Sequence, residues 1–297
     1  LHRRRHSFPT RRSSDLAQVF SISPQQIKVN STNTYRIANT SPSAASATAD
    51  LNGKAVLDAC EKIRERLILS AAEILGCLPE AVSLKDGQVL INGSPSSLTW
   101  NGLVNASYLK RVNLSEHGHY ATPGIHFNSE KEKGHPFAYH VYGTAITVVT
   151  VDCIRGTYEF DAVKLVHDFG TSMNPLIDKG QIEGGLVQGI GWMTMEEIIY
   201  DNEGKLRSNA LSTYKVPDIY SVPKELDIHF LETAKDNLAI FRSKAVGEPP
   251  LMYGIGAYFA LRNAIKAFNP NSDMAFSAPM TPEKVLMGLY APKTGNR

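Results

Sequence analysis

The first candidate for chemistry is a carboxylate, Glu248, in the stretch "RSKAVGEPPLMY" that runs from residue 242 to residue 253. Pro249 and Pro250 follow it directly, and they make the turn rigid because proline fixes φ and carries no N–H. A carboxylate just before a helix interacts favourably with the helix dipole, which alone explains a glutamate here. A rigid turn can equally hold a general base over a pocket, and we take Glu248 as the candidate base.

A second candidate is the stretch "TSPSAASATAD", residues 40–50, which consists mainly of small side chains. Small residues at the beginning of a helix leave backbone N–H groups open to an anion or to an oxygen of a cofactor. Ser43, Ser46 and Thr48 add hydroxyl donors. The alternative is a capped helix that packs tightly against a neighbour, and the stretch alone does not separate the two.

Two glutamines, Gln181 and Gln188, stand seven residues apart in a glycine-rich segment and share one face of the helix predicted there. An amide can recognise the edge of a heterocyclic cofactor, although a polar stripe facing solvent is the ordinary explanation. Gly189-Ile-Gly191 and Gly254-Ile-Gly256 lack the third glycine of the dinucleotide fingerprint. The three cysteines and the crowded histidines match no standard metal-ligand spacing.

Helices and strands in mixed order must position these residues. Helical periodicity and capping residues predict a long helix over residues 39–75, with a step near residues 52–53. They also predict shorter helices over residues 96–110, 174–200 and 249–268. Alternating apolar residues and turn pairs predict strands at 25–38, on both sides of 86–87, on both sides of 154–156, and at 225–232. The pattern predicts an α+β protein of two lobes, with mixed sheets, long helices and a lobe boundary near residues 136–170.

Composition sets wider limits. The chain has 297 residues, 42% hydrophobic and 20% charged, which is an ordinary balance for a folded protein with a sizeable core. The first 16 residues hold five arginines and one acid, Asp15, so the net charge of +2 leaves −2 for residues 17–297. A mildly acidic body gives no reason to expect nucleic acid as a partner. Three separate thiols suit a reducing compartment, and no stretch suits a membrane span, so we expect a cytoplasmic protein.

The basic head, "LHRRRHSFPTRRSSDL", has three explanations. It resembles an arginine-rich transit peptide, or an arm that binds nucleic acid. The stretch "TRRSSDL" is also what a common sequencing-adapter DNA encodes when it is read in frame. We favour this last explanation, in which residues 1–16 are a disordered artefact, residues 17–297 are the protein, and the coding sequence is truncated upstream of Ala17.

Four motifs carry a resemblance to one family. The stretches "STNTYRIANTSPSAASATADLNGKAV", "GQIEGGLVQGIGWMTMEE", "STYKVPDIYSVP" and "SKAVGEPPL" occur in this order in the molybdenum-binding part of xanthine dehydrogenases. The chain is identified on them as a member of this molybdenum hydroxylase family, from about residue 27 to the final helix. The resemblance implies the C-terminal portion of a molybdenum-cofactor-binding domain, in the form of the separate molybdopterin-binding subunit of bacterial enzymes.

The resemblance implies an oxidoreductase that converts hypoxanthine and xanthine to urate. Its molybdenum carries oxo, sulfido and hydroxyl ligands and is held by a pterin. The family's glutamate in Gly-Glu-Pro-Pro falls on Glu248, so Glu248 would take the proton of the molybdenum-bound hydroxyl. That oxygen would attack a ring carbon next to nitrogen while hydride moves to the sulfido ligand. A rigid turn that offers a base to a metal-bound nucleophile agrees with the interpretation from the residues alone.

The family's cofactor-contacting positions fall on small side chains and one amide, which are Ser43, Ala44, Ala45, Ser46, Thr48 and Gln181. The resemblance implies that Ala45 lies nearest the molybdenum and that the metal takes no side-chain ligand from it. We interpret Gln188 as a packing residue.

Several family segments have no counterpart in the chain. They are the Phe-Gly-Gly-Lys-Glu segment, the arginine that clamps the substrate, the aromatic pair that sandwiches the purine, and the Met-Gly-Gln-Gly loop. We therefore expect this chain alone to be inactive and its substrate to be chosen by residues upstream. Iron–sulfur clusters and FAD would belong to partner chains or domains of a hetero-oligomer. The alternatives are a sister molybdenum hydroxylase acting on aldehydes or other N-heterocycles, and a non-catalytic subunit-interaction fragment.

Overall fold

The computed structural model describes residues 16–30, 35, 46–231 and 238–291. The chain divides into two compact units, one of Leu1–Tyr139 with Asp236–Ser243, the other of His140–Lys235 with Lys244–Arg297. Both units combine helices and sheets, which confirms the predicted α+β class. The lobe boundary near residues 136–170 stays a prediction, and the first change of unit falls between residues 139 and 140. No helix in the described part of the chain is long and apolar enough to cross a membrane.

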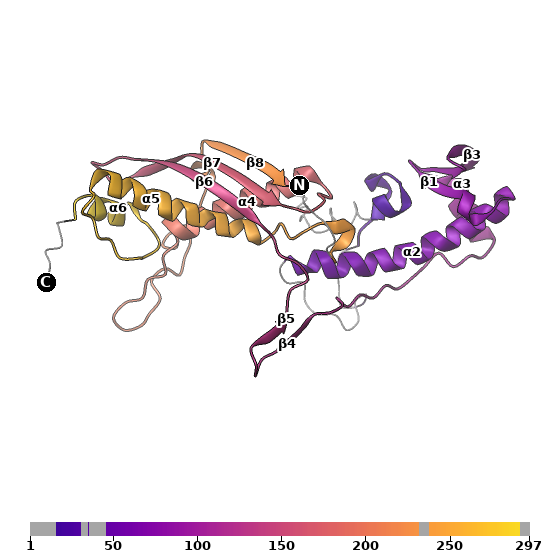
Figure 1. Cartoon of the computed structure of the whole chain (residues 1–297), viewed down its shortest axis with the longest axis horizontal. Coiled ribbons are helices and arrows are strands. Elements are labelled where there is room, and N and C mark those ends of the chain that lie inside the picture. Colours follow the sequence, from indigo (N-terminus) through magenta and orange to yellow (C-terminus); the bar gives the residue numbers. More distant parts are fainter. Residues whose placement is uncertain (1–15, 31–34, 36–45, 232–237, 292–297) are drawn as a thin grey trace. The chain divides into compact units, whose positions relative to one another are not determined.

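The first unit is built on a long helix and a three-stranded antiparallel sheet (Figure 1). Its elements are η1 (Pro24–Gln26), α2 (Ala47–Leu75), η2 (Pro79–Ala81), β1 (Val82–Lys85), β2 (Gln88–Ile91), β3 (Ser94–Thr99), α3 (Trp100–Leu109), β4 (His126–Asn128), β5 (Lys133–His135) and η4 (Ile240–Arg242). Leu67 of α2, Val89 of β2 and Leu103 of α3 are at most 1% exposed and form the centre of its apolar core.

The turn between β1 and β2 is the predicted hairpin. Lys85 pairs with Gln88, and the two residues between them, Asp86 and Gly87, have φ of 49° and 73°. A two-residue turn with both residues in the left-handed region matches the twist of the strands that it joins. The hairpin predicted around the Asp-Gly pair is therefore confirmed.

Helix α2 runs without a break through Gly53, so the predicted step near residues 52–53 is wrong. A Cβ at Gly53 would lie 2.9 Å from Cδ1 of Ile240, a fully buried residue of η4. The glycine therefore serves packing, because it lets the returning segment of the first unit lie against the helix. The helix begins at Ala47, and its predicted beginning at residues 39–45 lies outside the described residues.

Two more predictions for the first unit need correction. The strand over residues 25–38 is wrong for residues 25–30, because Ser23 and Gln26 form a capping box around η1, and most of the remainder lies outside the described residues. The helix over residues 96–110 begins only at Trp100, because residues 94–99 form β3. The hydroxyl of Thr99 accepts the N–H of Gly102 at 3.2 Å and caps the helix there.

The second unit contains a mixed sheet in the order β6 (Gly143–Val151), β7 (Tyr158–Asp168), β8 (Glu225–Leu231). The antiparallel pair β6 and β7 confirms the two strands predicted around residues 154–156. Strand β8 runs parallel to β7, and a parallel pair needs a long crossover. The crossover contains the two elements α4 (Pro175–Thr194) and η3 (Ile219–Ser221).

Helices cover one face of this sheet, as Figure 1 shows for α4 and α5. The elements after the crossover are η5 (Pro249–Gly254), α5 (Ile255–Phe268) and α6 (Pro282–Leu289). The core is formed by fully buried residues, which include Val163, Leu165, Ile182, Leu186, Ile190, Leu261 and Ile265. Helix α4 ends at Thr194 rather than at residue 200, and the helix predicted over 249–268 begins as the separate 3₁₀ turn η5.

Candidate functional site

Glu248 lies at the N-cap of η5 with its side chain exposed. Its neighbours on both sides are held in the interior, since Val246 is 1% exposed and Pro250 is buried. The carboxylate is therefore presented from a backbone held on both sides.

The glycines of α4 and η5 fix the turn on its downstream side. A Cβ added at Gly189 would overlap the carbonyl oxygen of Leu251, and a Cβ added at Gly254 would overlap the backbone of Gly189. A Cβ at Gly185 would lie 3.0 Å from Cβ of Pro250. One glycine of each pair that failed the dinucleotide fingerprint thus has a structural purpose, because Gly189 and Gly254 let α4 and η5 touch backbone to backbone.

A buried histidine holds the turn from the sheet. His167 of β7 is fully buried, and its two ring nitrogens lie 2.7 Å from the hydroxyl of Tyr253 and 3.3 Å from the carbonyl oxygen of Ala245. A carbonyl oxygen only accepts, so Nε2 carries the proton that faces Ala245. Burial lowers the pKa of His167, which favours the neutral ring, so Nδ1 accepts from Tyr253. Burial also raises the pKa of Tyr253 to about 12, which keeps that hydroxyl a donor.

This histidine predicts a pH dependence of stability. Burial lowers the pKa of His167 below its usual 6.5, so the unfolded chain binds a proton more readily than the folded chain. The contribution of neutral His167 to the free energy of unfolding is fully present above pH 6.5. It is lost as the pH falls from 6.5 towards the pKa of His167 in the folded state. We expect the unfolding temperature to fall between pH 7.5 and pH 5. The free energy of unfolding should decrease by at most about 1.4 kcal/mol per pH unit in this range.

Thermal unfolding of His167→Gln against wild type measures this contribution. The variant should unfold more easily at pH 7.5 but lose less on acidification than the wild type does. His229→Gln is the matched control, since His229 is exposed on the neighbouring strand β8. Equal acid sensitivity of wild type and His167→Gln would contradict the assignment.

Gln181 lies half-buried on α4, in the same unit as Glu248. Gly180 is next to Gln181 in the sequence, and Gly184 lies one turn further along the helix. A Cβ at either glycine would meet no other atom of the described residues within 4 Å. The backbone beside the amide is therefore open to a flat ring, which fits a pterin. Gln188 is exposed, so its interpretation as a packing residue is wrong.

The remaining predicted cofactor residues belong to the first unit. Ser46 is the N-cap of α2 and half-buried, and Thr48 in the first turn is 7% exposed. Asp50, in the same turn, accepts a hydrogen bond from the hydroxyl of Tyr139 at 2.5 Å. Ser43, Ala44 and Ala45 lie outside the described residues. The structure therefore describes Glu248 and Gln181 within one unit and Ser46 and Thr48 within the other.

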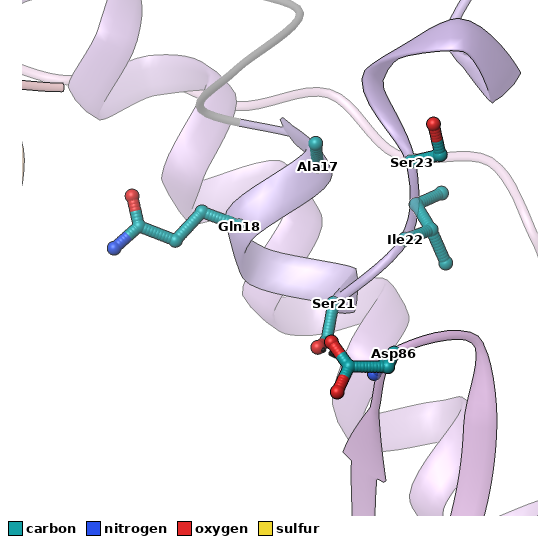
Figure 2. Close-up of a pocket in the computed structure, with 6 residues that line it drawn as sticks. All are labelled: Ala17, Gln18, Ser21, Ile22, Ser23 and Asp86. Atoms are coloured by element: carbon teal, nitrogen blue, oxygen red, sulfur yellow. Dashed lines mark hydrogen bonds between the residues drawn. The ribbon is translucent and has the colours of Figure 1, made fainter. Parts of the chain in front are cut away.

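Within the described ranges, no three or more His, Cys, Asp or Glu side chains lie together as a metal site. A hollow of about 500 Å³ in the first unit is lined by residues 17, 18, 21–23 and 86 (Figure 2). Ser21 and Asp86 lie side by side there, and the Asp86 N–H donates to the Ser21 hydroxyl at 2.9 Å. These groups hold the β1–β2 turn in place, and of the described site residues neither Ser46, Thr48, Gln181 nor Glu248 lines the hollow.

Residues 13–223 match the model of a protein family described as "Molybdopterin cofactor-binding domain". The chain belongs to this family of molybdopterin cofactor-binding domains. In sequence, it is 38% identical over 276 residues to the xanthine dehydrogenase of Drosophila subobscura and to the xanthine dehydrogenase/oxidase of Felis catus. Each alignment covers 91% of this molybdopterin cofactor-binding domain and 19% of the relative, so the chain spans about a fifth of their length.

Solved structures share the fold of this molybdopterin cofactor-binding domain. Quinoline 2-oxidoreductase from Pseudomonas putida 86 superimposes with a TM-score of 0.77 at 23% identity, over 95% of this chain and 35% of the other. The aldehyde oxidoreductase of Desulfovibrio desulfuricans gives a TM-score of 0.70 at 23% identity, over 95% of this chain and 27% of the other. The expected fold and family are thereby confirmed.

Sequence reasoning missed four polar residues of this molybdopterin cofactor-binding domain, which are His167, Asp168, Lys244 and Tyr253. They surround the turn that carries Glu248, and the first three are less than 10% exposed. Two signals were present. His167 and Asp168 stand between the apolar pair Leu165-Val166 and Phe169, and Lys244 precedes the apolar pair Ala245 and Val246. Charged residues are almost never buried without a partner, so each should have prompted a search for one.

Proposed function

We propose that this chain is the C-terminal part of the molybdenum-binding subunit of a xanthine dehydrogenase-type oxidoreductase. Its substrates would be hypoxanthine and xanthine, and its product urate. The names of its relatives at 38% identity support the purine class. The observation that carries the proposal is the exposed carboxylate of Glu248 on a turn that α4 and β7 hold from both sides. A base held in this way can accept a proton at a fixed point over a bound substrate.

The described residues fit the molybdenum–pterin cofactor. Gln181 would bind the pterin through its amide, beside the open backbone of Gly180 and Gly184. Ser46 and Thr48 would bind it at the beginning of α2, where backbone N–H groups favour anionic oxygens. Ser43, Ala44 and Ala45, which lie outside the described residues, belong to the proposed set as well. When bound, the cofactor supplies a two-electron oxidant.

The chain's own part in the reaction is proton transfer and placement. The carboxylate of Glu248 would accept the proton released when an oxygen nucleophile adds to the electron-poor ring carbon of the substrate. Pro249 and Pro250 keep that carboxylate in place, since their φ angles are fixed. The two electrons would leave through iron–sulfur clusters and FAD on partner chains or domains. We place this hetero-oligomeric assembly in the cytoplasm.

The test is made on the complete enzyme that contains this chain, purified with its partner chains. Molybdenum content, and the oxidation of xanthine and hypoxanthine to urate, are measured beside the oxidation of aldehydes and quinoline. Purine turnover with bound molybdenum would support the proposal. Molybdenum with turnover of aldehydes or other N-heterocycles alone would favour a sister hydroxylase, which the shared fold also suits. An enzyme without molybdenum would make the chain a non-catalytic interaction fragment.

The proposed pterin contact gives a separate prediction. Gln181→Ala should weaken retention of the cofactor by about 2- to 10-fold, since one hydrogen bond is worth about 0.5–1.5 kcal/mol. Gln188→Ala is the control, because Gln188 is exposed two turns along the same helix. Molybdenum per protein after dialysis is the measurement. If both variants retain the cofactor equally, Gln181 is not a pterin ligand.

A further inference from the structure

Three of the buried ionisable side chains in the second unit lie close to the segment that leads to Glu248 and take no part in the proposed chemistry. His167 and Asp168 end strand β7 at 0% and 1% exposure, and Lys244, at 9%, begins the segment that leads to Glu248. Charged side chains are rarely found at this depth, so each needs a physical reason. Their common feature is their place, because Lys244 precedes Glu248 by four residues in the sequence.

Asp168 and Lys244 form a buried ion pair. The ammonium of Lys244 contacts Oδ2 of Asp168, while Oδ1 of the same carboxylate accepts the N–H of Gly170 at 3.0 Å. The backbone N–H of Lys244 also donates to the carbonyl oxygen of Phe169 at 2.6 Å. The ammonium lies 5.6 Å from the ring centre of Tyr142, close enough for a cation–π contact. Side chain and backbone of Lys244 are therefore both fixed to the end of β7.

The neighbouring residue of β7 holds the other side of the turn. Successive side chains of a strand point to opposite faces, so Asp168 and His167 reach the segment from the two faces of the sheet. His167 contacts Ala245, three residues before Glu248, and Tyr253, five residues after it. One strand end thus holds the backbone ahead of Glu248 and the 3₁₀ turn behind it.

Stability alone does not account for this arrangement. Desolvating two charges offsets most of the attraction between them, and apolar residues of similar volume often serve a core as well or better. What an ion pair and a directed hydrogen bond provide is a defined geometry. A general base needs its carboxylate within a few tenths of an ångström of the productive position.

We propose that His167, Asp168, Lys244 and Tyr253 are positioning residues that set the place of the Glu248 carboxylate. The inference rests on the proposed function, in which Glu248 is the general base. None of the four touches the reacting atoms, and each acts through the backbone of residues 244–253.

The test uses the complete enzyme with its cofactor. The double variant Asp168→Asn with Lys244→Met leaves no unpaired charge, and the asparagine keeps the acceptor for Gly170. Tyr253→Phe removes a single hydroxyl. Each should lower kcat by about 10- to 100-fold, the effect of displacing a catalytic group by about 1 Å, with KM and molybdenum content unchanged. Lys224→Met is the control, since it removes an exposed ion pair with Glu159 on the same sheet.

The same substitutions in a Glu248→Gln background distinguish positioning from general damage. If they act through Glu248, they should cause no further loss there, because the group they place is already missing. Equal losses in both backgrounds, or no loss in either, would overturn the inference. If the double variant does not fold, Tyr253→Phe alone decides between these outcomes. A fully active Glu248→Gln enzyme would instead refute the proposed base, and the inference would fall with it.

Discussion

Replacing Glu248 by glutamine is expected to lower kcat of the complete enzyme by about 10²- to 10⁴-fold, the range that a positioned general base contributes. Glutamine keeps the length and shape of the side chain, but its amide does not accept a proton. The turn should keep its geometry, because the residues that hold it lie in α4 and β7. Steady-state kinetics with xanthine, beside molybdenum analysis of the same samples, make the measurement.

The molybdenum content of Glu248→Gln should equal that of the wild type, which separates lost chemistry from lost cofactor. Glu203→Gln is a matched control, since it changes an exposed glutamate in the Asp201–Gly204 turn of the same unit. Near-normal turnover of Glu248→Gln would remove Glu248 as the base. Low turnover together with low molybdenum would show instead that the residue serves cofactor binding.

Alanine at Gly254 or at Gly189 is expected to destabilise the second unit severely. At both positions the new Cβ would overlap backbone atoms of the facing element, and backbone cannot move aside as a flexible side chain can. Overpacking typically costs about 1–3 kcal/mol, and we expect at least the upper end of this range. For a domain of this size, that is a fall of about 6–12 °C in the unfolding temperature. Thermal unfolding of the cofactor-free protein measures it.

Gly184→Ala, in the same helix, is expected to stabilise the second unit rather than destabilise it. Its Cβ would meet no other described atom within 4 Å, and alanine is a better helix former than glycine by about 0.8–1.0 kcal/mol. We expect the unfolding temperature to rise by about 2–4 °C. If alanine at Gly189 and at Gly184 shifted unfolding by the same amount, close backbone packing between α4 and η5 would be refuted.

Local signals in the sequence predicted the local structure well. The Asp86–Gly87 turn, the β6–β7 pair and the beginning of α4 at Asn174 depend on neighbouring residues, and the structure has all three. Some failures, as at residues 25–30 and 94–99, were local, whereas others involve distant partners. Gly53 looked like a break in a helix because Ile240, which packs on it, lies far along the chain. Nothing near β8 in the sequence shows that it pairs parallel to β7 rather than extending a hairpin.

The candidate site divides in the same way. Glu248 could be proposed because its Gly-Glu-Pro-Pro context is local, and Gln181 because the resemblance marks it. The ion pair of Asp168 and Lys244 joins residues 76 positions apart, so no periodicity or spacing reveals it. The apolar neighbours of each residue indicate burial, but only the fold shows that the two are partners. Whether a charged residue is a functional group or a solvated one is thus decided by tertiary contacts.

Residues 236–243 belong to the first unit although they follow most of the second unit in the sequence, and this order affects folding during synthesis. A ribosome adds about 5–20 residues per second, so Ile240 emerges on the order of 10 to 40 s after Gly53, against which it packs. During that interval the face of α2 around Gly53 is without its native cover, while the strands β6, β7 and β8 are already synthesised. The unit that begins first along the chain is therefore completed only after most of the second has been translated, so the packing of Ile240 on Gly53 forms late in synthesis.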